Sequence, residues 1–366
     1  MSSYYIDNPI ITFLRSTLEN RPAPVDVVKD MDWKKLMAFA SKQAIVGVAF
    51  EGVKLCRQQY PEYVTKQDLM RGLMASEKIK ERNHLLNQRC VELQRMLSDA
   101  GFHSSILKGQ GLAKYYSEEL RLLRNPGDID VYVDCSKDEA ISYARSLGQK
   151  EVHWDYKHLH LHVWEKTSIE LHYRVEIVHN PIKNARLQRW FGRNKELLFC
   201  DDGEMVTPSL SMNLFYILLH IYSHFFGSGI GMKQLIDYYY IVRSADGHFD
   251  TFSGGETLND VLRRFGMLRF AGGVMWLLHE VTGLDQKYMY CLPHEKEGRC
   301  ILNEMLASGN LGLHDERVGN NSKNGKIGEM LDICRHNLHL LRLFPQDALM
   351  SPLWYLWHKV WTVWHK

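Results

Sequence analysis

Apolar residues recur every three or four positions over both ends of the chain, which is the spacing of one face of an α-helix. The longest such pattern runs from residue 66 to residue 100, and Gly101 follows it as a stop signal. Short helices are expected in residues 1–65, where prolines interrupt the chain, and the pattern is helical again from residue 205 onward. The chain is therefore predicted to be mainly helical.

The middle of the chain has a different pattern, in which short apolar runs and strict alternation replace the helical spacing. Strands are expected at 104–107, 128–133, 158–163 and 167–175, and a helix is expected at 136–147. Strands that alternate with helices over so short a stretch predict a small mixed sheet.

These patterns predict an α+β protein, mainly helical overall, with three parts. A helical N-terminal segment, 1–100, precedes a small α/β core, 101–203, and a helical C-terminal domain, 204–366, is expected to close a cleft in that core. The polar stretch between residues 308 and 325 is rich in Gly and Asn and predicts a mobile loop.

The candidate chemistry begins with an Asp-x-Asp motif in the second predicted strand. Side chains two residues apart share a face of a strand, so Asp128 and Asp130 should point together while Ile129 faces the core. Two like charges side by side are costly unless a cation offsets them, and oxygen ligands favour magnesium or manganese over zinc. Glu170, on the last predicted strand, is placed to complete a three-carboxylate site.

A glycine turn precedes this motif. Gly109 and Gly111 let backbone amides approach a ligand, so the turn is a candidate phosphate cradle with Lys108 beside it. An ordinary turn between a strand and a helix is the commoner meaning of Gly-x-Gly, and the downstream carboxylates are what favour the cradle.

Three histidines alternate with apolar residues in the third predicted strand. His158, His160 and His162 should share one face, and with His172 or His153 they form a candidate transition-metal site. The alternative, which we favour, is a half-exposed strand whose polar positions are histidine. If this face also bears Glu170, its histidines should line the substrate cleft.

Two further pairs lie one helical turn apart in the C-terminal domain. His220 and His224 lack a nearby Glu and are expected to pack against the core rather than to bind metal. Lys233 and Asp237 are interpreted as an ion pair on a helix surface.

Composition narrows the function classes. The chain has 45 basic and 43 acidic residues, a net charge of +2, so no global field favours stable DNA binding. Its seven cysteines show no Cys-x-x-Cys spacing, and residues 1–20 have no signal pattern, which predicts reduced thiols in a cytoplasmic protein. No apolar run reaches the roughly 20 residues that span a membrane, so no membrane association is expected.

Four tryptophans at helical spacing near the end predict a core or interface stripe rather than a membrane anchor. They are Trp354, Trp357, Trp361 and Trp364.

The ordered set of motifs resembles a known superfamily. Leu-Lys-Gly at 107–109, Arg-x-x-x-Asp-x-Asp at 124–130 and Ile-Glu-Leu-His at 169–172 resemble the nucleotidyltransferases typified by DNA polymerase beta. More narrowly, the chain is similar to the bacterial group of uncharacterised nucleotidyltransferases, over about residues 70–285. His220-x-x-x-His224 and the stretch at 231–237 resemble that group's helical C-terminal half. One position differs: the superfamily often has a small residue after the glycine of this turn, whereas this chain has Gln110 after Gly109.

The resemblance implies an enzyme that moves a nucleoside monophosphate from a nucleoside triphosphate to an acceptor, with release of pyrophosphate. Asp128, Asp130 and Glu170 would bind two Mg²⁺ or Mn²⁺ ions and act catalytically. Gly109 would let the backbone approach the phosphates, with Lys108 and Arg124 as charge partners. The acceptor is not specified by the resemblance: it could be a small molecule, a protein side chain or an RNA end. Two other hypotheses remain: a non-catalytic nucleotide-binding or regulatory protein, and a histidine-based transition-metal hydrolase.

Overall fold

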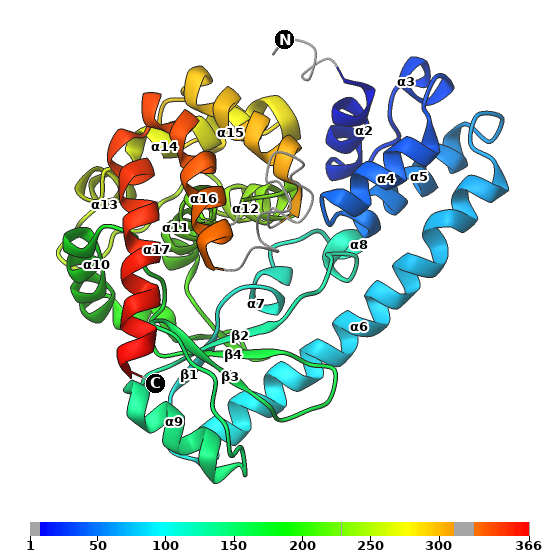
Figure 1. Cartoon of the computed structure of the whole chain (residues 1–366). Coiled ribbons are helices and arrows are strands. Elements are labelled where there is room, and N and C mark those ends of the chain that lie inside the picture. The colour runs from blue at the N-terminus through cyan, green and yellow to red at the C-terminus, as the bar shows by residue number, and fades with distance from the viewer. Residues whose placement is uncertain (1–7, 228, 311–325, 366) are drawn as a thin grey trace.

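The computed structural model describes residues 8–227, 229–310 and 326–365. Most of the predicted loop between residues 308 and 325 lies outside these ranges. Helices predominate, and one small mixed sheet lies near the middle of the chain (Figure 1). The prediction of a mainly helical α+β fold is therefore confirmed.

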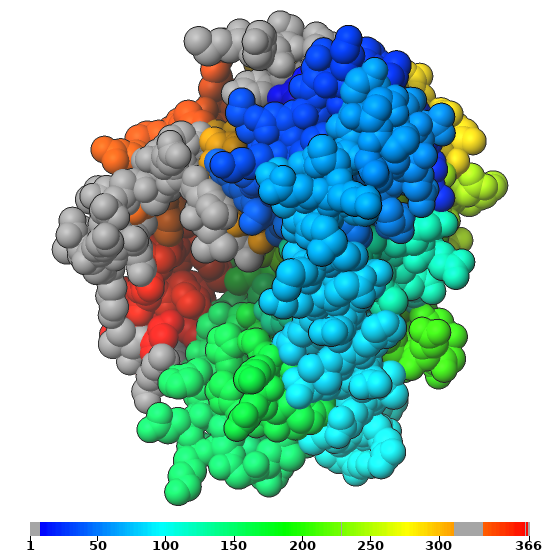
Figure 2. All heavy atoms as spheres, turned by 90° about the vertical axis from the view of Figure 1, so that its right-hand side faces the viewer, coloured from blue at the N-terminus to red at the C-terminus, as the bar shows by residue number. Residues whose placement is uncertain are grey.

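The N-terminal helices form where polar caps precede apolar patterns. Asn8 caps the first helix through the amide of Ile10, and Asp32 caps the third through the amide of Lys35. The predicted long helix begins at a capping box, in which Thr65 and Asp68 bind each other's backbone amides. It crosses one face of the molecule from the N-terminal helices to the sheet (Figure 2). These helices are α2 (Pro9–Leu18), α3 (Val25–Lys29), α4 (Trp33–Lys42), α5 (Val46–Gln59) and α6 (Lys66–Asp99).

The sheet has four strands in the order β1-β2-β4-β3. The central strands β2 and β4 are parallel, and each pairs with an antiparallel edge strand, β1 on β2 and β3 on β4. The strands are β1 (Ser104–Ile106), β2 (Ile129–Val133), β3 (His158–Leu161) and β4 (Ile169–His172). All four lie within predicted strands, which confirms the predicted mixed sheet.

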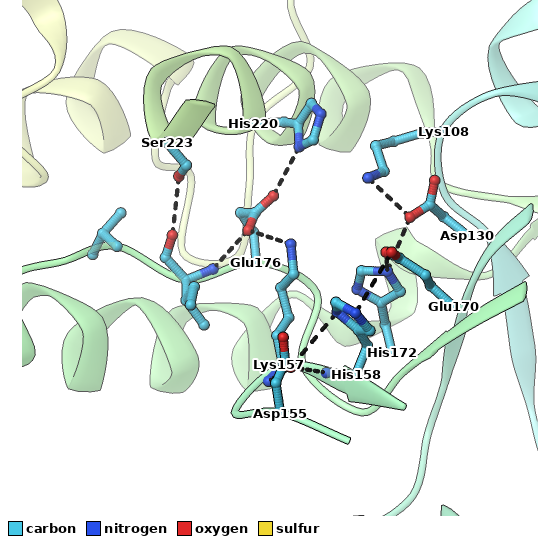
Figure 3. A network of polar contacts seen from close by, with 12 residues as sticks. Lys108, Asp130, Asp155, Lys157, His158, Glu170, His172, Glu176, His220 and Ser223 are labelled. Atoms are coloured by element: carbon cyan, nitrogen blue, oxygen red, sulfur yellow. Dashed lines mark hydrogen bonds and ion pairs between the residues drawn. The ribbon is translucent and has the colours of Figure 1, made fainter. Parts of the chain in front are cut away.

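Alternation divides the sheet into an apolar face and a polar face. The apolar residues pack in one hydrophobic cluster with α6 and α9 (Lys137–Ser146). Ser136 and Glu139 form the capping box that begins α9. The polar face is turned toward α11 (Leu210–Phe226), the central helix of the C-terminal half (Figure 3). Because α6 and α9 cover the apolar face of the sheet, a ligand can approach the described part of the sheet only at its polar face.

The remaining helices share one large core with the N-terminal helices. Gln43, which follows α4, donates to the carbonyl of Met305 and accepts from the amide of Met232, and so joins the N-terminal helices to the C-terminal half. The predicted three-domain division remains a prediction. These C-terminal elements are α10 (Pro181–Arg193), α11, α12 (Met232–Ser244), α13 (Leu258–Arg264), α14 (Leu268–Leu277), α15 (Glu295–Ser308), α16 (Lys326–Leu338) and α17 (Pro345–His365).

The tryptophan stripe of α17 packs against the core. Trp354, Trp357 and Trp361 each have a ring centroid 5.4 Å from that of Tyr156, whereas Trp364 is 83% exposed. The stripe is an interface, as predicted, although Trp357 is also 43% exposed and Trp364 lies outside the contact with Tyr156. No helix in the described parts of the chain has the length and hydropathy needed to cross a membrane.

Candidate active site

The strand register brings the three predicted carboxylates together. Asp130 on β2 lies directly opposite Glu170 on the parallel strand β4, and Asp128 precedes β2 on the same face. Ligand oxygens of Asp128, Asp130 and Glu170 all lie within 4.8 Å of one another. They line a cavity of about 290 Å³ between the polar face of the sheet, α11 and α12. The structure thus gathers the predicted metal ligands at one cavity.

Asp130 is buried at the centre of this group. Its Oδ1 atom lies 2.9 Å from Lys108 Nζ and 3.0 Å from His172 Nε2 (Figure 3). Burial by itself would raise the pKa of Asp130, but Lys108 and His172 outweigh it and hold that pKa well below its usual value. Asp130 is therefore ionised at neutral pH.

The other two carboxylates differ in their surroundings. Asp128 is partly exposed, and burial together with the neighbouring Asp130 raises its pKa. Burial also opposes ionisation of Glu170, but a hydrogen bond from His172 lowers the pKa of Glu170 overall. A divalent cation would favour the charged form of all three and remove the repulsion that Asp128 experiences.

His172 joins the two central strands. Its Nε2 atom lies within 3.3 Å of Glu170 Oε2 as well as beside Asp130. Burial lowers the pKa of His172, yet its bonds to these carboxylates raise it on balance. From the sequence, His172 is predicted only as part of the Ile-Glu-Leu-His motif and as a possible metal ligand. Its position between Asp130 and Glu170 is seen only in the structure.

The histidine strand contributes one residue to the cavity. His158 lines it, and His158 Nε2 lies 3.6 Å from Glu170 Oε1. His158, Glu170 and His172 form a second group that could hold a metal ion. His160 lies opposite Glu170 in the register, while His162 follows the end of β3 and is exposed. The expectation that this face lines the cleft holds for His158.

The glycine turn has the backbone that only glycine adopts readily. Gly109 has φ of +57° and precedes the short helix α7 (Gln110–Ala113), with Lys108 directed into the site. A Cβ atom on Gly111 would lie 2.6 Å from the carbonyl oxygen of Ile106, so this glycine allows close packing of α7 on β1. Gln110 turns away from the cavity and donates to Asn87 of α6 at 2.5 Å. Gln110, which stands where the superfamily commonly has a small residue, thus packs against α6 and does not line the cavity.

Arg124 lines the cavity but is bound to a carboxylate of the chain. Its Nε and Nη2 atoms donate to the two oxygens of Asp237 at 2.6 and 2.8 Å, and the Tyr116 hydroxyl donates to the same carboxylate. The interpretation of Lys233 and Asp237 as a surface pair is wrong, because Asp237 is buried and pairs with Arg124. The predicted contact of Arg124 with phosphate remains a prediction.

Two further lysines line the cavity: Lys233, which the sequence offers as a phosphate contact only after Lys108 and Arg124, and Lys157, which it does not assign to the site. Lys233 has no described carboxylate within ion-pair distance, and burial, with nearby Arg124, lowers its pKa to about 8. Lys157 Nζ lies 3.0 Å from Glu176 Oε1, and His220 Nδ1 lies 3.0 Å from Glu176 Oε2. His220 thus packs against the core as expected. Lys157 directly precedes the histidine strand but is not part of its alternating pattern, so no sequence signal could have found Lys157.

The buried pair of Lys157 and Glu176 predicts a pH dependence of stability. Burial opposes ionisation of Glu176, but Lys157 and His220 hold its pKa well below the usual value. Its contribution is therefore full above the ordinary Glu pKa of about 4.3 and is lost as pH falls through the lower folded pKa. Glu176→Gln should lower the free energy of unfolding by about 3 kcal/mol at neutral pH, and by less in acid. Urea unfolding across this range measures the difference, and a constant difference would contradict the assignment.

Comparison with known proteins agrees with this geometry. A model of a family described as uncharacterised nucleotidyltransferase matches residues 29–283. The match begins earlier than expected from the motifs, at the end of α3, and ends soon after α14. No curated protein and no solved structure matches the chain. The matched stretch holds all three carboxylates, the glycine turn and α12, and the chain belongs to the uncharacterised nucleotidyltransferase family.

Proposed function

We propose that the protein transfers a nucleoside monophosphate from a nucleoside triphosphate to an acceptor hydroxyl and releases pyrophosphate. The observation that carries this proposal is the group of three carboxylates on adjacent parallel strands, within 4.8 Å of one another in a cavity. Their all-oxygen donor set fits Mg²⁺ or Mn²⁺. Asp128 and Asp130 would hold two such ions and Glu170 one of them, and the bound ions would activate the attacking oxygen and neutralise the triphosphate.

The charges around the cavity fit a triphosphate with its metals. Arg124 and Asp237 neutralise each other and Lys157 is paired with Glu176, which leaves Lys108 and Lys233 opposite the three carboxylates. A triphosphate carries roughly four negative charges, which two divalent ions offset. The lysines would then hold individual phosphate oxygens, and Gly109 would let the backbone come close to them.

The direct test supplies the protein with Mg²⁺, a cell extract and each α-labelled nucleoside triphosphate in turn. Transfer of label to an extract component, with release of pyrophosphate, is the expected result. A nucleotide that binds without turnover would instead favour a regulatory nucleotide-binding protein on the same fold.

The group of His158, Glu170 and His172 supports a second candidate function, a transition-metal hydrolase. Imidazole nitrogens favour zinc or iron over magnesium. However, His172 Nε2 already contacts two carboxylates, so a metal bound through this nitrogen would compete with both contacts. Stoichiometric zinc or iron in the purified protein, lost in His158→Ala but not in Asp128→Asn, would favour the hydrolase.

Glu170→Gln should lower the transfer rate by roughly 10²-fold, because the amide is a weak metal ligand and cannot take the acceptor's proton. The rate at saturating nucleotide measures this effect. Glu165→Gln, at an exposed position in the loop before β4, is the matched control. An unchanged rate in Glu170→Gln would move the third ligand elsewhere.

Lys233→Met should raise the KM for nucleotide by roughly tenfold with little change in kcat, because methionine keeps most of the aliphatic stem but loses the charge. Since the pKa of Lys233 is about 8, the parent's KM should also rise above that pH, whereas the variant's should not. Lys35→Met, at an 83% exposed side chain, is the control. Equal KM values in parent and variant at neutral pH would exclude a phosphate contact.

A further inference from the structure

A second cavity, of about 300 Å³, adjoins the first. The two share Lys157, His158 and His224 in their linings. Figure 3 shows Lys157 and His158 at this boundary, with Glu176 on one side and Glu170 on the other. A ligand in the second cavity would therefore approach the carboxylates from the Glu170 end, while Gly109 and Lys233 line only the first cavity.

The far wall of the second cavity is aromatic. Trp354 of α17 lies there with Tyr355, and the ring of His179 stacks on that of Trp354 with centroids 6.2 Å apart. Tyr156, which also lines this cavity, contacts Trp354 edge-on, and the ring centroid of Trp357 lies 4.6 Å from that of Trp354. A ring fixed in this way offers a flat apolar surface to another ring. Helix α17 begins at Pro345, beyond the segment that matches the family, so this wall is additional to the family core.

The charge of the second cavity differs from that of the first. Its ionised groups are Asp155, Glu176 and Lys157, and Lys157 is already paired with Glu176. Burial lowers the pKa of His179 to about 4 and also lowers the pKa of His358, so both imidazoles are neutral hydrogen-bonding groups at neutral pH. This lining disfavours a triphosphate and suits an uncharged or cationic molecule with hydroxyl groups.

We propose that the second cavity binds the acceptor, and that the acceptor is a small uncharged or cationic molecule with a ring that lies on Trp354 and a hydroxyl that reaches the Glu170 carboxylate. This inference rests on the proposed function. The acceptor oxygen forms a bond to the α-phosphorus, the bond from that phosphorus to the bridging oxygen breaks, and pyrophosphate leaves with the electron pair. The hydroxyl proton passes to Glu170. The family core thus supplies the chemistry, and α17 selects the acceptor.

Equilibrium dialysis of the full chain tests the binding site directly. The probe is the small-molecule filtrate of a cell extract, and mass spectrometry detects the compounds that the protein retains. Trp354→Ala should retain such a compound roughly tenfold less well than the parent, because the stacking surface is lost. Trp354→Phe keeps a ring and should retain it. Trp364→Ala, on the exposed end of the same helix, is the matched control and should behave like the parent.

Binding of a fluorescent ATP analogue with Mg²⁺ is measured on the same variants. An unchanged Kd in Trp354→Ala is expected, and it also shows that this variant is folded. If Trp354→Ala weakens nucleotide binding instead, the cavity holds the base of the donor and the acceptor proposal is overturned. Absence of any retained compound that depends on Trp354 overturns it as well.

Label transfer separates this inference from the proposed function. With α-labelled nucleotide, the parent should label a compound of the filtrate and Trp354→Ala should label it roughly tenfold less. Label confined to the macromolecular fraction and unaffected by Trp354→Ala would keep the reaction but overturn the acceptor site. A compound that binds through Trp354 but never becomes labelled would contradict the reaction and leave the cavity as a ligand site.

Discussion

Asp130→Asn is expected to lower nucleotidyl transfer by roughly 10³-fold, because this carboxylate would bind both metal ions at the centre of the site. Asp128→Asn should impair transfer to a similar degree. Transfer rates at saturating nucleotide and metal measure both effects. Asp138→Asn is the control, since this side chain is 89% exposed on α9, away from the cavity. A double variant of Asp128 and Asp130 with near-parental transfer would rule out the site.

The two variants should differ in stability. The neutral amide at position 130 leaves the Lys108 ammonium buried without its partner, so the free energy of unfolding should fall in Asp130→Asn. Asp128 is partly exposed, and its pKa is raised by burial and by Asp130. Asp128→Asn should therefore leave stability unchanged or raise it. The two like charges of the Asp-x-Asp motif would by themselves make either substitution relieve repulsion, and only the structure shows that Lys108 makes the two residues unequal.

Local patterns carried the prediction of the sheet and its carboxylates. Alternation along β2 placed Asp128 and Asp130 on one face, and the polar position in Ile-Glu-Leu-His placed Glu170 on the same side of a neighbouring strand. Parallel pairing of β2 with β4 then set Asp130 opposite Glu170. The face on which each carboxylate lies follows from the period of a strand and from burial of its apolar face, which sequence records directly. The pairing of β2 with β4 does not follow from these patterns.

Contacts between side chains of distant segments could not be predicted from the local sequence pattern. Glu176 follows β4, its partner Lys157 precedes β3, and His220 belongs to α11, so their pairing depends on how the C-terminal helices pack on the sheet. The wall that Trp354 forms depends in the same way on the docking of α17 against Tyr156. Helical spacing could predict that the tryptophans share a face, but not which surface that face covers.

Arg124 and Asp237 are the clearest case of such a long-range pair, and they carry the other large prediction. Both side chains are buried, and the guanidinium binds the carboxylate through two hydrogen bonds. A lysine cannot make this two-pronged contact, so Arg124→Lys should lower the free energy of unfolding by about 3 kcal/mol or more. Urea unfolding followed by circular dichroism measures the loss. Retention of parental stability would show that the pair contributes little.

A double-mutant cycle distinguishes this structural role from a role in phosphate binding. Arg124→Met and Asp237→Leu should each destabilise strongly, because each leaves one buried charge without its partner, whereas the double variant should lose less than the sum. Nucleotide affinity is measured on Arg124→Lys and Asp237→Asn under conditions where both remain folded. If Arg124 acts only by joining α12 to the loop before β2, the two variants should weaken nucleotide binding to a similar extent, since both disturb the same wall of the cavity. If Arg124 also grips a phosphate, Arg124→Lys should weaken binding more than Asp237→Asn, because the loss of Asp237 leaves the guanidinium free to reach the ligand.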